Sequence, residues 1–586
     1  MTNRSVFFIK INQLIAYAIL RINDIKRALI HYLNVTSGIA CILVTLLLTI
    51  DFGFNLHHTT TTLFLSFHTY LLYYFLFDFT FRLLFEQKRI RYILLRPTDI
   101  LTLYPLSAHI SFIGSFLGLY QSFFISQITL LLIMFGRLPH INHFLNELKL
   151  KPTQMFVFAF LFTIFLGSLL LILPLSTTGN KLTYIDALFT SFSAICVTGL
   201  SVVDIGTTFT RFGQIIILIL IQIGGLGIMT FSILFGSIMQ RKFSHMATSE
   251  FQESYNTYNL SETFVAIKFI FKLTFFVEIL GAIFLFMNWH HRFDHYNDAL
   301  FYSVFHSISA FCNAGFSLFS TNLVEFQSHL GVISTISILI VLGGLGFPVL
   351  YNLFQFSQSR GRGVVLKLHT KLALVMTTLL LIMGTLFIYL FESQQSLTTL
   401  TQAEKILVSF FHSVSSRTAG FNSIDLAYFS PPTLVFMMIL MMIGASPGST
   451  GGGLKTTTVG IMILSFWHNL KQSRHTILYR RTIEWESVQK TFTILILALL
   501  ILFIFFIALL TTESIGFVPL LFETVSALGT VGFSMGITAE LSVIGKMLVM
   551  GLMFIGRLGV LTIAYALSQQ KTISSYHYPK ERIIIS

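Results

Sequence analysis

The feature that most constrains the fold is a short polar segment that occurs four times along the chain. The related stretches are SFSAICVTGLSV at 191–202, SISAFCNAGFSL at 307–318, SSRTAGFNS at 415–423 and TVSALGTVGFSM at 524–535. Each contains one shared glycine, and consecutive shared glycines are between 105 and 116 residues apart. Because self-similarity at a steady period marks a repeated structural unit, we expect four similar units.

A second small-residue motif follows each of these segments. It reads GGLG at 224–227, GGLG at 343–346, GASPG at 444–448 and GRLG at 556–559, and it begins 24 to 28 residues after the shared glycine. Within each unit an apolar run precedes a short amphipathic run rich in Phe and Ser, and another apolar run follows the loop. This order predicts a helix, a short helix with a loop, and a second helix in every unit.

The composition places these units in a membrane. The chain is 54% hydrophobic and 10% charged, with a mean hydropathy of +0.79, whereas soluble domains have about 25% charged residues. Apolar runs of the length that crosses a bilayer, about 20 residues, recur through the chain, for example QMFVFAFLFTIFLGSLLLILPL. We therefore expect an all-α protein that crosses the membrane many times.

The short amphipathic run of each unit has about half the residues that a crossing needs, so it should enter and leave from one side. Non-helical backbone at membrane depth is tolerated only where it is buried in protein or lines a watery cavity. Four such re-entrant loops are best placed around one axis. The repeats therefore predict one central pore with fourfold pseudosymmetry.

The loops themselves carry almost no side-chain chemistry. Rings of backbone carbonyls can replace the hydration shell of a potassium ion, and glycine permits the backbone angles that this requires. The alternative is that the glycines only allow helices to pack closely. Four glycines in register after four matching short helices favour the pore.

These residues also carry a resemblance to a known family. With VTGLS, CNAGFS, RTAGFNS and TVGFS as loops and ASPGSTGGGLKTTT in the sixth apolar run, residues 153–570 resemble the Trk/Ktr/HKT superfamily of potassium transporters, and the third unit is similar to the bacterial Ktr/Trk membrane subunit. The resemblance implies that potassium is the transported ion, held only by filter carbonyls, with no covalently bound cofactor. In that family a serine in the first filter tends to accompany sodium transport, so Gly199 implies potassium. The implied selectivity-filter residues are Val197, Thr198, Gly199, Asn313, Ala314, Gly315, Thr418, Ala419, Gly420, Thr530, Val531 and Gly532.

The third unit departs from the others after its loop. Its second apolar run contains GASPGSTGGGLKTTT, which cannot remain a continuous lipid-facing helix, so we expect a break there. A simple glycine kink is the alternative. The resemblance implies an intramembrane gating loop at 444–457, beneath the filter. Its implied gating residues are Gly444, Gly448, Gly451, Gly452, Gly453 and Lys455.

Three basic residues are predicted to lie near the pore. Lys455 is costly within the membrane and is therefore a functional candidate, although the basic stretch after it would let its side chain snorkel. Arg557 replaces the second glycine of its GGLG motif, so symmetry turns it into the cavity below the filter, where a cation raises the barrier for passing cations. The family resemblance gives Arg557 the same gating role. The alternative pairs it with a helix carbonyl or a lipid phosphate.

Arg417 precedes the third filter, and we expect it to brace the short helix, with Glu523 as the candidate partner.

The basic residues give the orientation. The net charge is +13, and clusters of Lys and Arg fall in alternate loops. Cytoplasmic loops of membrane proteins carry such an excess, which argues against a nucleic-acid partner. The pattern predicts a multi-pass protein of the cell membrane (inner or plasma membrane) with both termini in the cytoplasm, surrounded by lipid.

We divide the chain accordingly. The four units should span 153–245, 246–365, 366–482 and 483–570, with a cytoplasmic tail at 571–586. Apolar runs near 37–50, 61–86, 98–118 and 119–136 predict about four helices in an accessory region at 1–152. Asp78 and Asp99 give that region a faint likeness to a voltage sensor, but it lacks a series of arginines that could serve as gating charges.

The predicted function is gated potassium uptake. A secondary transporter that couples potassium to sodium or protons is the alternative, but it would need more intramembrane carboxylates than Glu278 and Glu523. No convergent catalytic pattern indicates an enzyme. Four loops already complete a ring in one chain, so we expect a homodimer with one pore per chain. The resemblance implies a separate cytosolic nucleotide-binding regulatory subunit.

Overall fold

The structure of the chain is a computed structural model. It describes residues 58–85, 152–179, 182–227, 260–358, 365–473 and 475–567, together with scattered positions between 21 and 133. Helices dominate these residues, and the strands found in them are the two of a small antiparallel hairpin, β1 (Ile477–Leu478) and β2 (Arg481–Thr482). The predicted all-α fold class is confirmed.

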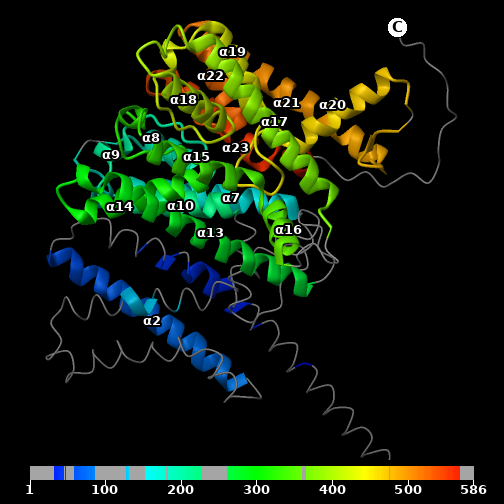
Figure 1. Cartoon of the computed structure of the whole chain (residues 1–586). Helices are drawn as coiled ribbons and strands as arrows, with labels where there is room; N and C mark the ends of the chain where they lie inside the picture. Colours follow the sequence, from blue (N-terminus) through cyan, green and yellow to red (C-terminus); the bar gives the residue numbers. More distant parts are fainter. Residues whose placement is uncertain are drawn as a thin grey trace, which may run out of the picture.

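Four groups of three helices follow one another along the chain (Figure 1), and we refer to them as units 1 to 4. Each consists of an apolar helix, a short helix with a loop after it, and a second apolar helix. In chain order, the units are α7 (Pro152–Leu171), α8 (Tyr184–Ile195) and α10 (Arg211–Leu226); α13 (Leu260–Trp289), α14 (Tyr296–Phe311) and α15 (Leu330–Leu345); α17 (Leu368–Glu392), α18 (Gln402–Ser415) and α19 (Pro431–Met442); and α21 (Trp485–Thr512), α22 (Phe517–Gly529) and α23 (Val543–Leu558).

Besides these units, the described residues form one long helix near the N-terminus and several shorter elements. The other α-helices are α2 (His58–Phe85), α9 (Ile205–Thr208), α16 (Phe347–Gln358), α20 (Thr456–Leu470) and α24 (Val560–Leu567). Single 3-10 turns are η1 (Pro174–Ser176), η2 (His290–Arg292), η3 (Val324–Phe326), η4 (Leu426–Tyr428) and η5 (Ile537–Glu540).

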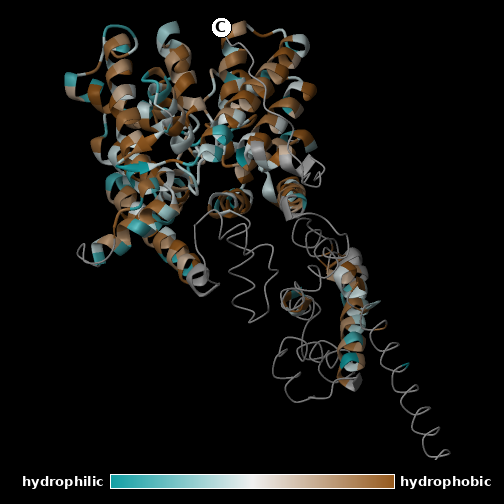
Figure 2. Ribbon diagram, turned by 90° about the vertical axis from the view of Figure 1, so that its right-hand side faces the viewer, coloured by the Kyte–Doolittle hydropathy of each residue, from teal (hydrophilic) through white to brown (hydrophobic). Residues whose placement is uncertain are grey.

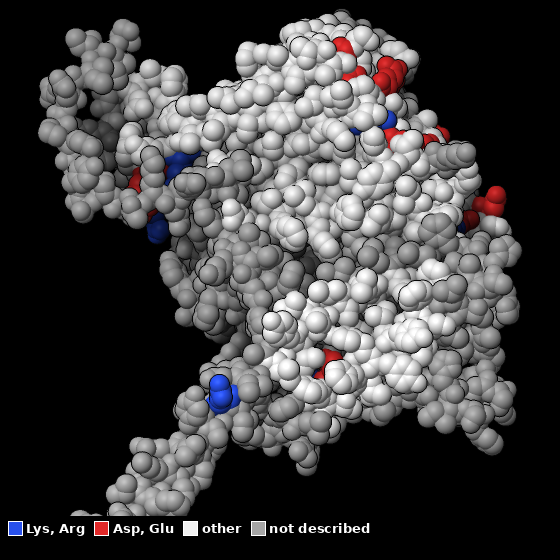
Figure 3. All heavy atoms as spheres, turned by 180° about the vertical axis from the view of Figure 1, so that it is seen from behind, with Lys and Arg blue, Asp and Glu red and all other residues white. Residues whose placement is uncertain are grey.

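The outer helices have the length and composition of membrane spans. Three helices in the described part of the chain qualify on their own, Val265–Arg292, Leu368–Glu392 and Trp485–Thr512. Their outward side chains are apolar, as at Phe276 and Ile496, which are 61% and 62% exposed. Hydrophobic residues make up most of the helices coloured in Figure 2, and among the described residues on the face shown in Figure 3 few are charged. A surface of this kind suits hydrocarbon rather than water.

The short helices lie inside, and they link the units into a ring. The second apolar helix of every unit packs against the short helix of the next one: α10 on α14, α15 on α18, α19 on α22, and α23 on α8. In two of the units, hydrogen bonds within the first turn of the short helix fix the residue at which it begins. Thr183 accepts a hydrogen bond from the Asp186 N–H, and Thr401 and Glu404 form a capping box.

Glycine ends the second apolar helix in three units. Gly227, Gly346 and Gly559 follow α10, α15 and α23 with φ angles of 82°, 90° and 88°, a region that favours glycine. After Gly346 the chain turns by 96° into α16. In unit 3 the interruption is longer, because α19 ends at Met442 and α20 begins only at Thr456.

The N-terminal region has a small core of its own. Cys41, Leu72, Phe75 and Leu130 belong to one buried cluster, and the Arg82 Nε donates to a buried Asp78 carboxylate at 2.9 Å. The predicted run at 98–118, with Asp99, and the tail at 571–586 lie outside the described residues. The unit boundaries stay predictions.

Candidate functional site

The four loops share an unusual backbone conformation. Two residues before each shared glycine, a residue with a side chain has a positive φ: Val197 (55°), Asn313 (59°), Thr418 (73°) and Thr530 (50°). The shared glycines also have positive φ: Gly199 (93°), Gly315 (69°), Gly420 (73°) and Gly532 (95°). Left-handed backbone at residues other than glycine costs free energy and persists only where the surroundings impose it. The same strained conformation at four equivalent positions therefore indicates one backbone structure that the surroundings impose on all four loops.

Each loop touches the next one through its glycine. A Cβ atom added to any of the four glycines would come within 2.6 Å of a carbonyl oxygen in the neighbouring loop. Gly199 meets Ala314, Gly315 meets Ala419, Gly420 meets Val531, and Gly532 meets Thr198. The fourth loop thus returns to the first, and one polypeptide closes the ring.

Serines from the short helices hold the loops in place. The Gly199 N–H donates to Ser193 Oγ at 3.0 Å, and the Gly532 N–H donates to Ser526 Oγ at 3.2 Å. In the other two units, Ser309 Oγ and Ser415 Oγ donate to the carbonyls of Phe316 and Phe421. Our sequence analysis missed these serines, although SFS, SIS, SVS and TVS recur in register at these positions.

The third loop is shorter by one residue. In the other units the residue before the glycine donates its N–H to a serine carbonyl five positions back, as from Thr198 to Ser193 at 2.9 Å. In unit 3 the Ala419 N–H reaches Ser415, four positions back, at 3.0 Å. The repeat is therefore approximate in backbone geometry as well as in sequence.

The insert of unit 3 lies against the ring. The chain from Ile443 to Lys455 folds into a loop whose ends are joined by a hydrogen bond from the Leu454 N–H to the Met442 carbonyl at 3.1 Å. A Cβ on Gly451 would collide with Thr418 Oγ1, and one on Gly452 would collide with Thr530 Oγ1. The loop thus directly contacts the re-entrant loops of units 3 and 4.

Backbone hydrogen bonds fasten this loop to unit 2. The Ser446 N–H donates to the Gly344 carbonyl at 3.0 Å, and the Phe347 N–H donates to the Gly448 carbonyl at 3.0 Å. The bend between α15 and α16 frees these backbone groups for the loop. Gly444 packs against Gly452 at the neck of the loop, where a Cβ would not fit.

Two cations hold three successive carbonyls of the loop. Arg557 donates to the carbonyl of Thr450 and, through its other terminal nitrogen, to the carbonyl of Gly224 in unit 1. Lys455 Nζ donates to the Gly451 carbonyl at 2.7 Å and lies 3.5 Å from the Gly452 carbonyl. The predicted gating residues are therefore brought together below the ring.

A cavity opens on the other side of the ring. It has a volume of about 500 Å³ and reaches Gly199, Gly420 and Gly532. Residues that follow the four glycines line it; many are small and polar, Leu200, Val324, Leu426 and Phe533 are apolar, and Asp425 is the acidic residue among them. An open cavity above the ring and a filled space below it make the two sides unequal.

Ion pairs connect units across the ring. Lys546 Nζ in α23 contacts an Asp186 carboxylate oxygen in α8 at 2.8 Å. Arg211 in α10 pairs with Asp298 in α14 in a similar way. Both pairs join a second apolar helix to the short helix of the next unit.

Among the described residues there is no group of three or more His, Cys, Asp or Glu side chains that could hold a metal ion.

Comparison with known proteins decides the family. The family model described as TrkH, cation transport protein, matches residues 121–576. The Ktr system potassium uptake protein B of Bacillus subtilis (strain 168) is 39% identical over 433 residues, which is 74% of this chain and 96% of that protein.

The chain belongs to the TrkH family of cation transport proteins.

Two further proteins are similar to this chain over nearly their whole length. The potassium/sodium uptake protein NtpJ of Enterococcus hirae is 36% identical over 446 residues, 75% of this chain and 98% of that protein. The solved structure of the potassium transporter TrkH from Vibrio parahaemolyticus matches with a TM-score of 0.59 over 81% of this chain and 97% of that one, at 18% identity, which is a likeness in fold. The resemblance read from the loops is thereby confirmed.

Membership in the TrkH family makes the chain a multi-pass membrane transport protein and, as predicted, not an enzyme. One sequence prediction about this TrkH-family chain is wrong. Among the described residues no ion pair joins Arg417 to Glu523; Glu523 Oε1 accepts a hydrogen bond from Thr538 Oγ1 at 2.5 Å, and Glu523 Oε2 has no hydrogen-bond partner. The Arg417 Nε has no hydrogen-bond partner among the described residues.

Proposed function

We propose that the chain carries potassium ions into the cell through its ring of four loops. The closed cycle of contacts through Gly199, Gly315, Gly420 and Gly532 carries the proposal, because it sets backbone carbonyls of four units around one axis. A carbonyl ring of this kind can replace the hydration shell of potassium. The names of the relatives, a potassium uptake protein and a potassium transporter, agree with this ion.

The filter consists of segments 197–199, 313–315, 418–420 and 530–532 in this proposal. Their side chains are small or apolar apart from Asn313 and the threonines, so the backbone supplies the ligands. Glycine at 199 favours potassium over sodium by resemblance to the family. The Enterococcus hirae relative is named for both ions, so the flux of both has to be measured.

The loop from Gly444 to Lys455 is the gate. It contacts the filter segments at Thr418 and Thr530, and Arg557 and Lys455 bind its carbonyls. A glycine-rich backbone segment and two positive charges in one place form a steric and electrostatic barrier to a cation. Opening requires the loop to leave the ring.

The family resemblance and the charge pattern support the proposed partners and location. A cytosolic nucleotide-binding subunit regulates the gate, and two chains form a homodimer with one pore each. The protein lies in the cell membrane with its basic loops and both termini in the cytoplasm. Beyond the glycine breaks at Gly346 and Gly559 the chain continues into α16 and α24, and these helices are the proposed cytoplasmic contact surface for such a subunit.

Passive conduction fits the buried carboxylates better than ion-coupled transport. Glu278 accepts hydrogen bonds from the Gln222 amide at 3.1 and 3.3 Å, and Glu523 accepts one from Thr538. Neither belongs to the filter segments or lines the cavity above them. A carboxylate that binds a coupling ion would be expected beside the path of the substrate.

The experiment is ion flux in liposomes that contain the purified full chain. Uptake of potassium, rubidium and sodium is measured separately, with and without a sodium or proton gradient. The proposal requires uptake of potassium and rubidium well above that of sodium and without dependence on either gradient. Transport that stops when the sodium or proton gradient is removed would instead identify the coupled transporter.

A further inference from the structure

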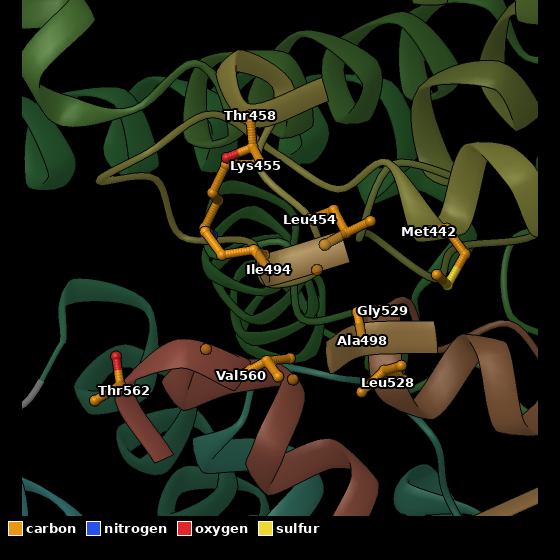
Figure 4. A pocket seen from close by; sticks show the side chains of 13 residues that line it. Met442, Leu454, Lys455, Thr458, Ile494, Ala498, Leu528, Gly529, Val560 and Thr562 are labelled. Atoms are coloured by element: carbon orange, nitrogen blue, oxygen red, sulfur yellow. The ribbon is translucent and has the colours of Figure 1, made fainter. Parts of the chain in front are cut away.

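A cavity lies beside the loop on the side away from unit 2. It has a volume of about 110 Å³, and its walls come from the end of the loop, α20, α21, α22, α23 and α24. Figure 4 shows Leu454, Ile494, Leu528 and Val560 around one space, with Lys455 and Thr458 at its edge. Its walls are mostly apolar. An apolar cavity of this order stays free of water and accepts an apolar molecule; a cavity of about 150 Å³ holds benzene.

The loop is attached unequally to its two neighbours. Toward unit 2 it makes backbone hydrogen bonds through Ser446 and Gly448. Toward unit 4, its last residues, Gly453 to Lys455, border the cavity. Free space next to the loop is therefore found on its unit 4 side in the described part of the chain. A displacement of the end of the loop has room in that direction.

The exposed apolar face of a membrane span lies next to the same cavity. One wall is α21, a membrane span whose neighbouring side chains Ile496, Leu499 and Leu500 are 62%, 48% and 49% exposed. Ala498, which lines the cavity, is 2% exposed and has the smallest side chain in this stretch of α21. The acyl chains that cover the outer face of α21 in a bilayer therefore reach within one helix of the cavity.

We propose that the end of a phospholipid acyl chain enters this cavity beside α21 and holds the loop in its blocking position. The chain end fills the space that Gly453, Leu454 and Lys455 need when the loop moves away from the ring. The apolar walls select hydrocarbon, and the bilayer supplies it. The effect on flux rests on the proposed gate, whereas occupancy of the cavity does not.

Occupancy is tested with the full chain in nanodiscs of phosphatidylethanolamine and phosphatidylglycerol whose acyl chains carry bromine. We expect bromine density between Leu454, Ile494 and Val560. Ala498→Phe fills the cavity and should remove this density while density along the outer face of α21 remains. No bromine in the cavity of the parent chain, or unchanged bromine in Ala498→Phe, would overturn the site. This readout stands even if the chain transports no potassium.

The link to the gate is tested by potassium flux in liposomes of the same lipids without bromine. Ala498→Phe should lower flux several-fold, because the added ring takes the space of the lipid chain permanently. Leu499→Phe is the matched control, since it adds a ring to the next residue on the lipid-facing side and should leave flux unchanged. Ala498→Leu serves as a milder filling variant if the phenylalanine prevents folding. Equal flux in both filling variants and the control, with equal amounts of folded protein, would overturn the link.

Discussion

Gly532 in the fourth loop lies so close to Thr198 in the first that a side-chain carbon on Gly532 would collide with the Thr198 carbonyl oxygen. This contact closes the ring within one polypeptide. The ring needs no second chain, and a homodimer would therefore contain two of them. The contact also leaves no space for a side chain at a position where the backbone is already left-handed.

Arg557→Ala should raise potassium flux several-fold without a cytosolic partner. The substitution removes a positive charge and both hydrogen bonds, to Thr450 in the loop and to Gly224 in unit 1. The ratio of potassium to sodium flux should stay nearly the same, because the filter segments are not changed. Flux in liposomes with matched amounts of folded protein measures both. A flux at or below that of the parent would show that Arg557 is not part of the barrier.

Lys455→Met should also raise flux, because Met keeps the length of the side chain and removes the ammonium that binds the Gly451 and Gly452 carbonyls. Lys471→Met, one residue past the other end of α20, is the control, since that side chain is exposed and does not touch the loop. The two variants are compared in the same flux assay. A similar rise in both would point to a general charge effect instead of a local one.

More of the fold than of the candidate site could be predicted from the sequence. The four polar segments, each followed by a second small-residue motif, predicted four units, because a period of this kind has few structural explanations. The contacts of Arg557 could be predicted only in part, since symmetry indicated the side to which it points but not the carbonyls that it would meet. The Arg417 prediction was wrong, because sequence position alone does not fix which side chains meet between two units. The serines that hold the loops recur in the sequence at equivalent positions, but small hydroxyl side chains are equally common where helices pack together.

Ser193→Ala should weaken ion selectivity. It removes the hydroxyl that accepts the Gly199 N–H; this donor is partly buried, so leaving it unsatisfied costs at most about 1–3 kcal/mol, which the loop can recover by changing its conformation. Ser191→Ala is the control, because its hydroxyl donates to the Ile164 carbonyl, away from the loop. The ratio of potassium to sodium flux in each variant is the measurement. Equal ratios in the parent and both variants would contradict the role of Ser193.

Asp186→Asn should lower thermal stability, because it breaks the 2.8 Å contact with Lys546 that joins units 4 and 1. Both side chains are 15% exposed, so we expect a loss of about 1 kcal/mol or somewhat more. Glu325→Gln provides the comparison, because its contact with Arg292 is 3.9 Å long and both side chains are largely exposed. Thermal unfolding in detergent should show a lower transition temperature for Asp186→Asn alone. The same temperature for both variants would mean that the pair does not stabilise the ring.

The most direct test of the account is the ratio of potassium to sodium uptake by the parent chain and by Gly199→Ser in the same liposomes. Gly199 has a φ of 93° and packs against the Ala314 carbonyl, so a side chain there must displace the ring of carbonyls. The account predicts uptake by the parent that favours potassium by about tenfold or more, and a ratio that falls about fivefold or more in Gly199→Ser. Equal ratios in the two proteins, with equal amounts folded and reconstituted, would contradict a filter built from these four loops.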